Sequence, residues 1–579
     1  MSYEPSGFAR QIFASRHAIY QEEPWVDACK RVAWQVADAE AGEARVKWFN
    51  EFRDALVDNR FMPGGRIWYG SGRPRGQLLN CFVIPTGDSR EAWGKTLYDT
   101  VVIAGTGGGI GANYSSIRPN GFPIKGVGGK ATGAVSLMVG VNEIGEIIGQ
   151  GGGRRIALMQ ALSLSHPDII EFLDKKLDLK ELNNANVSII FDDDPNRFFE
   201  LVKKDEDWPL IFQGKQVGAI PAKKLWERII TNALKGGEPG ILNGFLANRM
   251  SNIHYVEALT CTNPCGEIWM SPYDSCCLGH VVLTRFVNEG QFDWDGFRDT
   301  IRLGVRFLDD VLSVNTYPLP EIAAKCSELR RVGLGVLGLH HMLIELGYKY
   351  NSVEGLEFVD KLFKFMKNES YEASIDLAIE KGSFPAFEAD KFVKSAFVKT
   401  LRPSIVKRIK EHGIRNCALN TIAPTGTISM ISEVSSGIEP IFAMAYERRY
   451  RKDAEIAVEV VADPLFKRYV AEGRSTENFQ NAYDLSIRDH LEMQRTCQRH
   501  VDNAVSKTIN LPPGTTMEEL SELYMEFLPE LKGVTCYPVG AREDQPLTPL
   551  TREVAEQIVF DAISEAAGND NCRNGSCDV

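Results

Sequence analysis

The sequence predicts an α/β protein with a helical segment at its N-terminus. From Pro63 onward, short apolar runs alternate with Gly-rich turns and longer amphipathic stretches, the pattern of strands followed by helices. Before that point, apolar residues recur at three- and four-residue spacing, for example over 25–52, which predicts helices. We therefore expect a helical domain over 1–60, an α/β domain over 61–545 and a polar tail over 546–579.

The individual elements follow from the same patterns. Strands are predicted within the apolar runs 78–85, 187–191 and 418–422. Helices are predicted over 222–234, 294–314, 353–380 and 517–528, the last with Thr515 and Thr516 as candidate caps. The chain shows no fixed-period repeat and no low-complexity linker, so one large domain is favoured over a row of small ones.

Composition excludes several classes of protein. Of the 579 residues, 44% are hydrophobic and 25% charged, which is typical of a packed globular chain. A formal charge of -12 argues against a broad nucleic-acid-binding surface. The first twenty residues lack the apolar core of a secretion signal, and the uncharged run 100–117 is too rich in glycine for a membrane helix. We expect a cytoplasmic protein without membrane or nucleic-acid partners.

The pentapeptide Asn263-Pro264-Cys265-Gly266-Glu267 is the sharpest local feature. Proline fixes one φ angle and glycine removes a Cβ, so the backbone can turn tightly and present the Cys265 thiol at its tip. Asn263 and Glu267 add an amide and a carboxylate on either side, which suits holding and deprotonating a hydroxyl beside a sulfur centre. The alternative is an ordinary Pro-Gly turn with a buried cysteine.

Twelve cysteines are too few for a disulfide scaffold, so cysteine chemistry has to be local. A two-electron dithiol needs two sulfurs that approach each other from separate strands, and Cys81 and Cys276 could do so. The alternative is that each is a small core residue. We place Cys261, Cys326, Cys417, Cys497 and Cys536 in that structural class. No metal site is expected, because Cys276 and Cys277 are adjacent rather than spaced as zinc ligands.

Cys572 and Cys577 lie on a polar C-terminal stretch without apolar residues, where burial does not explain them. They suit a mobile dithiol shuttle, and the alternative is two incidental thiols. Two Gly-rich segments suggest anion binding, at 105–111 and 424–427. The first matches neither a P-loop nor a complete dinucleotide-binding fingerprint. A third Gly-rich segment, at 150–155, carries two arginines and could be a responsive loop near a nucleotide.

Taken together, these segments resemble the catalytic subunit of ribonucleotide reductases, most closely the adenosylcobalamin-dependent class II enzymes. The resemblance is carried, in family order, by PGGRIWYGSG, LLNCFVIPTGDS, GTGGGIGANYSSIRPNG, QGGGRRIALM, HPDIIEFL, NPCGE, YDSCCLG, APTGTISMI with SSGIEPIFA, and GVTCYPVGAR, over residues 60 to 545. It implies a ten-stranded α/β barrel of two five-stranded halves, with Cys265 on a finger loop inside.

The resemblance also implies residue roles. Cys265 would carry the thiyl radical that abstracts the ribose 3′-hydrogen, with Asn263 and Glu267 serving the 3′-hydroxyl. Cys81 and Cys276 would be the reducing pair, recharged by Cys572 and Cys577 and then by a thioredoxin- or glutaredoxin-like reductant. The implied substrate-binding residues are Asn80, Gly109, Pro424, Thr425, Gly426, Thr427 and Ile428. The implied effector-binding residues are Asp88, Ser89, Arg118, Ile124, Gln150 and Arg154. Cys277 has no implied role.

The radical source is inferred from one dipeptide. Family members that import the radical from a metal subunit use two stacked tyrosines, where this chain has Tyr537-Pro538. Proline has no phenol to oxidise, so adenosylcobalamin is the expected cofactor. The alternative is a class I-type subunit that needs a separate radical-generating metal subunit. The glycyl-radical class is disfavoured, because its C-terminal signature is missing.

Regulation and assembly are likewise expectations from the resemblance. No space for an ATP-cone domain precedes residue 60, so we expect no overall on/off control, whereas deoxynucleotide or ATP effectors should still set substrate specificity. In the family that site lies at a helical dimer interface, which favours a homodimer. A catalytically silent nucleotide-binding regulator is the competing class of function, and it would require the active-site thiols to be dispensable.

Overall fold

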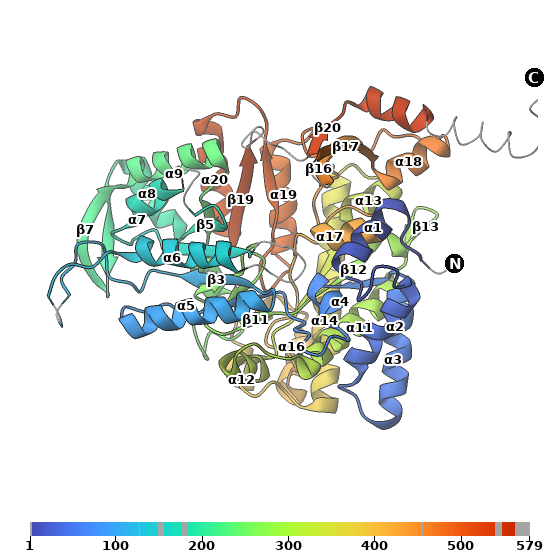
Figure 1. Cartoon of the computed structure of the whole chain (residues 1–579), viewed down its shortest axis with the longest axis horizontal. Coiled ribbons are helices and arrows are strands. Elements are labelled where there is room, and N and C mark those ends of the chain that lie inside the picture. The colour runs from blue at the N-terminus through green and yellow to red at the C-terminus, as the bar shows by residue number, and fades with distance from the viewer. Residues whose placement is uncertain are drawn as a thin grey trace, which may run out of the picture.

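The computed structural model describes residues 3–124, 126, 128–148, 156–176, 182–452, 455–538 and 547–561. The N-terminal region is helical, as predicted, with α1 (Gly7–Arg16), α2 (Trp25–Ala37) and α3 (Gly42–Val57). The predicted helical stretch 25–52 is divided between α2 and α3. These helices lie together at one side of the molecule (Figure 1), and Trp25 packs against Trp68 with ring centroids 4.9 Å apart. The helical domain is therefore fixed to the start of the α/β region by buried aromatic rings.

The largest sheet has eight strands, in the order β11-β2-β3-β4-β5-β8-β19-β18. The five strands β2, β3, β4, β5 and β8 are mutually parallel, whereas β11 at one end and β19 near the other pair antiparallel with them. Their bounds are β2 (Cys81–Val83), β3 (Gly109–Asn113), β4 (Leu158–Ser163), β5 (Ala185–Ile190), β8 (Gly240–Leu242), β11 (Ser275–Cys276), β18 (Thr508–Leu511) and β19 (Gly533–Pro538).

A second sheet has three strands in the order β1-β12-β15, namely β1 (Phe61–Pro63), β12 (Leu278–Val282) and β15 (Gly333–Leu337). Strand β12 follows β11 after a single residue, so one stretch of chain contributes to both sheets. The predicted strand 418–422 is represented by isolated bridges, from Asn420 to Leu334 and from Ile422 to Val505. The structure confirms a helical N-terminal domain followed by a mixed α/β fold. Among the described residues, the eight-stranded sheet and this three-stranded sheet do not join into one closed barrel sheet.

Helices cover these sheets. Beside the eight-stranded sheet lie α5 (Arg90–Gly105), α6 (Ala134–Ile147), α7 (Ile169–Lys175), α8 (Pro195–Lys204), α9 (Ala222–Gly236) and α20 (Met517–Phe527). Figure 1 shows α5 and α6 side by side along one face of the molecule. Around the three-stranded sheet lie α11 (Trp294–Val314), α12 (Pro320–Leu329), α13 (Leu339–Glu345), α14 (Val353–Lys381) and α16 (Pro403–His412), whereas α19 (Ile487–Gln498) packs between α14 and strand β18 of the eight-stranded sheet.

Smaller elements complete the described chain. They are α4 (Gly65–Gly70), α10 (Gly244–Arg249), α15 (Ala389–Phe392), α17 (Gly426–Ser432), α18 (Pro464–Ala471), the hairpins β6 (Asp207–Phe212) with β7 (Lys215–Pro221), β9 (Cys261–Thr262) with β10 (Trp269–Met270) and β13 (Val287–Asn288) with β14 (Gln291–Phe292), and the 3₁₀ turns Leu283–Phe286, Val398–Thr400 and Leu528–Glu530.

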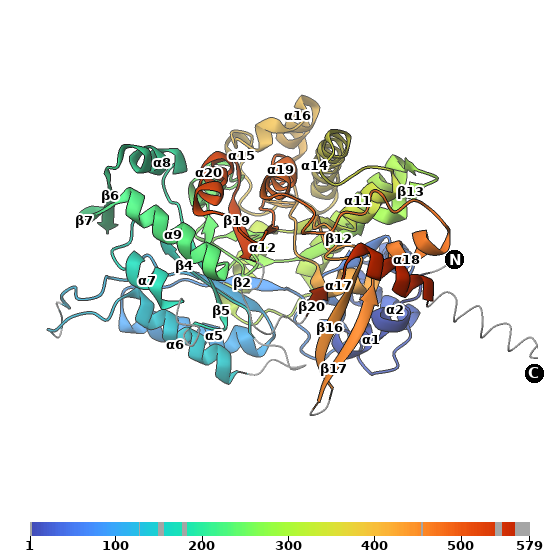
Figure 2. The same cartoon turned by 90° about the horizontal axis from the view of Figure 1, so that it is seen from above.

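A separate three-stranded sheet has the order β17-β16-β20, with β16 (Ala445–Lys452), β17 (Glu455–Ala462) and β20 (Leu547–Pro549). Figure 2 shows its β16–β17 hairpin extending away from the body. Residues 547–561, which the sequence assigned to the tail, include β20 and a helix over 552–561 with Ala555 and Val559 buried. Cys572 and Cys577 lie outside the described residues.

The long helices agree closely with the sequence patterns. Helix α11 has the predicted bounds, and α9, α14 and α20 differ from theirs by one or two residues. Thr516 caps α20, because its side chain accepts a hydrogen bond from the backbone nitrogen of Glu519 at 3.1 Å. Within the described ranges, none of the helices combines the length and the apolar character that crossing a bilayer requires.

Candidate active site

The turn around Cys265 is the tip of a short hairpin formed by β9 and β10, in which Trp269 pairs with Thr262. Gly266 has φ +81°, a conformation that glycine adopts without strain. The backbone nitrogen of Gly266 donates to the carbonyl of Asn263 at 3.0 Å, which closes the turn. The local prediction of a tight turn with one thiol at its tip is confirmed.

Strand β3 accommodates this hairpin by lacking side chains on the face that touches it. A Cβ on Gly111 would lie 1.9 Å from the carbonyl oxygen of Thr262. A Cβ on Gly109 would lie 2.9 Å from the sulfur of Cys81 and 3.1 Å from the ring of Pro264. The two glycines, two residues apart on one face of the strand, therefore let the hairpin backbone lie directly against the sheet.

Gly111→Ala is expected to lower the free energy of unfolding by about 3 kcal/mol, because the new methyl group overlaps the hairpin backbone rather than a movable side chain. Denaturant unfolding measures this loss. Gly94→Ala on α5 is the matched control, because its Cβ meets nothing within 4 Å and alanine favours a helix. Equal stability of the two variants would contradict the close approach of hairpin and sheet.

Contacts from both sides hold the hairpin tip. Asn186 on β5 donates its Nδ2 to the carbonyl of Pro264 at 2.9 Å. The carbonyl of Glu267 accepts two hydrogen bonds, from Oγ1 of Thr421 at 2.7 Å and from the nitrogen of Ala504 at 2.8 Å. The sequence interpretation missed these three positioning residues, because no local motif links them to the pentapeptide.

Asn263 and Glu267 flank the thiol with polar atoms that are not used elsewhere. Both side chains are buried. The Oδ1 of Asn263 accepts from the nitrogen of Ile268 at 3.1 Å, which orients the amide. Among the described residues, Nδ2 of Asn263 and Oε2 of Glu267 have no hydrogen-bond partner. One buried donor and one buried acceptor are thus available to a polar ligand.

Burial raises the pKa of Glu267 from 4.5 to about 7, although the amide of Asn263 opposes this rise in part. A carboxyl group with a pKa near the working pH can both take up and release a proton. The Cys265 side chain is exposed at the hairpin tip, and the surrounding protein, followed by Glu267 and Cys81, raises the pKa of its thiol above the usual range. A raised thiol pKa disfavours the thiolate, which is the form that attacks as a nucleophile or binds a metal.

Cys81 and Cys276 face each other across neighbouring strands, since Cys276 on β11 is the antiparallel partner of Cys81 on β2. Both are free thiols, Cys276 buried and Cys81 half-buried. Burial, followed by the neighbouring Cys81, raises the pKa of Cys276 well above its usual range. Directly opposed positions suit disulfide formation, so the structure brings together the predicted dithiol.

The remaining thiols fit a structural role. Cys277 is buried and turns away, with its sulfur 3.6 Å from the carbonyl of Leu308. The five cysteines that we placed in the structural class, Cys261, Cys326, Cys417, Cys497 and Cys536, are all buried. Among the described residues, no cluster of three or more His, Cys, Asp or Glu side chains is arranged to hold a metal ion.

A cavity of about 200 Å³ opens at the Cys265 side chain. Its lining includes Cys265, Pro424, Lys507 and Thr508, so the hairpin tip and the turn before α17 border one space. The turn itself is unusual, because Thr425 has φ +54° and its Oγ1 accepts from the nitrogen of Gly437 at 2.8 Å. Helix α17 begins at Gly426, and the first amides of a helix have no acceptor within it.

The other predicted residues form two further groups. Asn80 precedes Cys81, and its backbone joins β11 and β3 through hydrogen bonds to Cys276 and Gly109, both at 3.0 Å. Its Oδ1 is buried and without a partner among the described residues. Asp88 and Arg118 form an ion pair at 3.0 Å.

Ser89, next to Asp88, caps α5 with its side chain. Ile124 lies on the loop that Arg118 contacts through the carbonyl of Pro123, at 3.0 Å. Asp88, Ser89, Arg118 and Ile124 are thus brought to one region. Gln150 and Arg154 lie outside the described residues.

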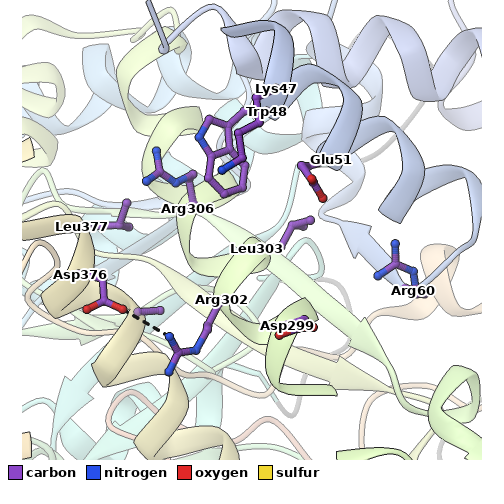
Figure 3. Close-up of a pocket in the computed structure, with 11 residues that line it drawn as sticks. Lys47, Trp48, Glu51, Arg60, Asp299, Arg302, Leu303, Arg306, Asp376 and Leu377 are labelled. Carbon is purple, nitrogen blue, oxygen red and sulfur yellow. Dashed lines mark hydrogen bonds and ion pairs between the residues drawn. The ribbon is translucent and has the colours of Figure 1, made fainter. Parts of the chain in front are cut away.

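A hollow of about 420 Å³ between α3, α11 and α14 is a different kind of site (Figure 3). Figure 3 shows Arg302 directed toward Asp376, with which it forms an ion pair at 3.3 Å. Arg306 is 4.2 Å from the ring centre of Trp48 and is bound by Glu40 at 2.6 Å. Because these cations are already neutralised and no cysteine lines the hollow, the thiol cavity is the better candidate for chemistry.

Comparison with known proteins agrees with this geometry. The family model "Ribonucleotide reductase, barrel domain" matches residues 79–537, and "Ribonucleotide reductase, all-alpha domain" matches residues 3–76. A vitamin B12-dependent ribonucleoside-diphosphate reductase of Thermoplasma acidophilum is 35% identical over 578 residues, covering 93% of this chain and 72% of the relative. A protein of the same name from Mycobacterium tuberculosis is 33% identical over 566 residues, covering 93% and 78%. A ribonucleoside-diphosphate reductase subunit alpha of Chlamydia pneumoniae is 26% identical over 464 residues, covering 69% and 44%.

Proposed function

The chain belongs to the ribonucleotide reductase family and is an enzyme that reduces ribonucleotides to 2′-deoxyribonucleotides, and from this premise we propose that Cys265 is its radical-carrying residue. The observation that carries the proposal is the position of the Cys265 thiol, which opens into a cavity and has the carboxyl group of Glu267 and the thiol of Cys81 as charged or polar neighbours, with Cys276 paired opposite Cys81. As a thiyl radical, Cys265 takes the hydrogen atom from C3′ of the ribose, which re-forms its S–H bond and leaves a carbon radical on the sugar.

Glu267 and Asn263 act on the 3′-hydroxyl. The Glu267 carboxylate accepts the hydroxyl proton while the sugar carries the radical, and the Asn263 amide holds the hydroxyl oxygen by donating its Nδ2 hydrogen. Both atoms lack other partners among the described residues, which supports this assignment.

Cys81 and Cys276 supply the two electrons. The 2′-hydroxyl leaves as water with a thiol proton, the second thiol hydrogen replaces it on carbon, and the two sulfurs form a disulfide. Glu267 returns the proton, and Cys265 returns its hydrogen atom to C3′ and is again a thiyl radical. The balance is one ribonucleotide and two thiols giving one deoxyribonucleotide, one water and one disulfide. Cys572 and Cys577 then reduce that disulfide by exchange and are recharged by a thioredoxin- or glutaredoxin-like protein. Asn80, Gly109 and 424–428 hold the substrate, with the first amides of α17 at the phosphates.

Adenosylcobalamin is the proposed cofactor, in keeping with the vitamin B12 dependence stated in the names of the relatives. The aromatic residues Phe442, Tyr446, Tyr483 and Tyr537 line a cavity of about 690 Å³ and would hold the cofactor there. Thr508 lines this cavity and the Cys265 cavity, so the two are neighbours. When bound, the cofactor supplies the one-electron oxidant that removes hydrogen from a thiol. The alternative, a class I-type subunit, lacks the second tyrosine of the radical path, because Pro538 follows Tyr537.

The decisive experiment is an anaerobic assay of the purified chain with adenosylcobalamin and dithiothreitol. We expect deoxynucleotide formation without a second protein, and faster turnover of CDP than of CTP, since the relatives are named diphosphate reductases. No product with the cofactor, together with activity after addition of a metal-containing radical subunit, would establish the alternative.

The effector site is proposed at Asp88, Ser89, Arg118 and Ile124, with Gln150 and Arg154 on the following loop. Exposed apolar side chains on the paired helices α5 and α6, namely Tyr98, Val101 and Ile147, support a homodimer through this face. The effectors are deoxynucleotides or ATP.

Asp88→Asn is expected to weaken effector binding about tenfold and to remove effector-dependent substrate preference, because Arg118 loses its 3.0 Å ion-pair partner. Turnover without effector should be unchanged. Competition assays with two substrates measure the preference. Asp27→Asn, which removes an exposed ion pair with Lys30, is the control and should behave like the parent chain.

The ten-stranded barrel is also a proposal. One half would be the parallel set β2, β3, β4, β5 and β8, and the other would combine β1, β12 and β15 with the segments 418–422 and 505–511. The hydrogen bonds from Leu334 to Leu419 at 2.7 Å and from Ile422 to Ala504 at 3.2 Å support these neighbours. We retain the domain limits 1–60, 61–545 and 546–579.

A further inference from the structure

The turn Ser271-Pro272-Tyr273-Asp274 leads directly into β11 and therefore sets the position of Cys276. Tyr273 has φ +67°, in the left-handed region that non-glycine residues rarely occupy. Such a conformation persists only where surrounding contacts determine it. The contacts of Tyr273 therefore bear on the geometry of the reducing pair.

The backbone of the turn is attached to the strand that carries Cys81. The nitrogen of Tyr273 donates to the carbonyl of Val83 at 2.7 Å, and the nitrogen of Val83 donates to the carbonyl of Asp274 at 3.2 Å. These bonds extend the pairing of β2 with β11 past Ser275, in the direction away from Cys276. A shift of the turn would consequently be transmitted to the register of the two thiols.

The side chain of Tyr273 ties the turn to α5. Its hydroxyl donates to Oδ2 of Asp99 at 3.0 Å, and Asp99 is fully buried. The other carboxylate oxygen of Asp99 accepts from Nζ of Lys95 at 2.6 Å, and Lys95 also pairs with Glu321 on α12 at 3.1 Å. The phenol is therefore held by a carboxylate that is itself fixed by an ion-pair network.

We propose that Tyr273 is a positioning residue for Cys276: its hydrogen bond to Asp99 anchors the turn on α5 and keeps Cys276 opposite Cys81. The inference rests on the proposed function, in which these two thiols are the reducing pair. It goes beyond that function by naming the residue outside the thiol site that sets the fit of the pair.

Other contacts keep the turn folded when the phenol hydroxyl is removed. Asp274 accepts from Nε of Arg331 at 2.6 Å, and the hydroxyl of Ser275 lies 2.9 Å from the sulfur of Cys326. Phenylalanine at 273 keeps the ring beside Lys95, whose Nζ lies 5.4 Å from the ring centre. Tyr273→Phe should thus loosen the alignment of the thiols without unfolding the strand pair.

A looser turn lowers the effective concentration of one thiol at the other. Disulfide geometry is strict, so the Cys81–Cys276 disulfide should become easier to reduce. In Tyr273→Phe we expect the equilibrium constant for forming the Cys81–Cys276 disulfide, measured against dithiothreitol, to fall about fivefold. This is the size of effect typical of one buried hydrogen bond. The kcat should fall by a similar factor, with the KM for the ribonucleotide unchanged.

The experiment equilibrates the full chain in anaerobic dithiothreitol redox buffers, without substrate or cofactor, and quantifies each thiol by differential alkylation and mass spectrometry. Asp99→Leu removes the same hydrogen bond from the other side and should give the same fivefold change. Tyr255→Phe is the matched control, because its hydroxyl donates to the carbonyl of Ala386 at 3.0 Å, in a different loop. It should lose comparable stability and leave the thiol equilibrium unchanged.

The outcomes separate two failures. If the parent chain forms no Cys81–Cys276 disulfide during a single turnover, the proposed function is wrong. If it does, and Tyr273→Phe and Asp99→Leu keep the parental equilibrium constant, the positioning role of Tyr273 is wrong. An equal change of the equilibrium constant in Tyr255→Phe would also overturn the positioning role of Tyr273, because the effect would then come from a general loss of stability.

Discussion

Cys265→Ser is expected to lower turnover at least about 10⁴-fold, the scale on which enzymes lose activity when a residue that carries the chemistry is removed. A serine hydroxyl keeps the size of the side chain but holds its hydrogen too strongly to exchange it with a ribose carbon. The thiol lines an open cavity instead of packing against neighbours, so nucleotide binding and thermal stability should remain close to those of the parent chain.

Two measurements test this result, an anaerobic turnover assay and calorimetric titration with the nucleotide. Cys536→Ser is the control, since this buried thiol on β19 lies 3.7 Å from the carbonyl of Ala233 and serine can donate the same hydrogen bond. Residual activity of Cys265→Ser above about a hundredth of the parental value would exclude Cys265 as the radical carrier. Loss of nucleotide binding would instead indicate a role in forming the cavity.

Glu267→Gln should lower turnover by about 10²- to 10⁴-fold, the range typical of a general base. In the parent chain, the pKa of about 7 predicts that turnover rises about tenfold between pH 6 and pH 8, as the carboxylate forms. The glutamine variant should lose this rise. A pH–rate profile with saturating substrate measures both effects, and Glu22→Gln at an exposed position is the control. An unchanged profile in Glu267→Gln would show that another group supplies the base.

The same carboxyl group predicts a stability effect with a definite sign. Because the folded pKa is raised from 4.5 to about 7, the folded chain binds more protons than the unfolded chain between these values. The protonated carboxyl group therefore contributes about 3 kcal/mol to the free energy of unfolding below pH 4.5. This contribution is lost as the pH rises through 7. The free energy of unfolding of Glu267→Gln should therefore differ less between pH 5 and pH 8 than that of the parent chain.

Local sequence predicted the parts of the site that depend on neighbouring residues. Proline and glycine around Cys265 predicted the turn, and apolar spacing predicted α11 to its bounds. The sequence also indicated that Cys81 and Cys276 would meet from separate strands. It did not predict their register, because pairing of β2 with β11 joins segments almost two hundred residues apart and depends on contacts such as that of Tyr273 with Asp99.

The supports of the hairpin could not be predicted for the same reason. Thr421 and Ala504 hold the carbonyl of Glu267 from segments with no motif in common, and only folding brings them together. The segment 418–422 has the apolar composition of a strand, yet it pairs only through single bridges at Asn420 and Ile422. Composition predicts that such a segment is extended, but the extent of its pairing is decided by its neighbours.

At Gly111, strand β3 meets the hairpin main chain against main chain, because a Cβ there would overlap the carbonyl group of Thr262, whereas the nearest neighbours of Gly109 are the side chains of Cys81 and Pro264. Elsewhere in a protein interior, a residue that grows can be compensated by a neighbour that shrinks. At Gly111 the nearest atoms belong to the backbone of Thr262, so no substitution of a neighbour can make room and no larger residue should be tolerated there. A saturation library at position 111, selected for growth that depends on this enzyme, should return glycine and no second-site suppressor.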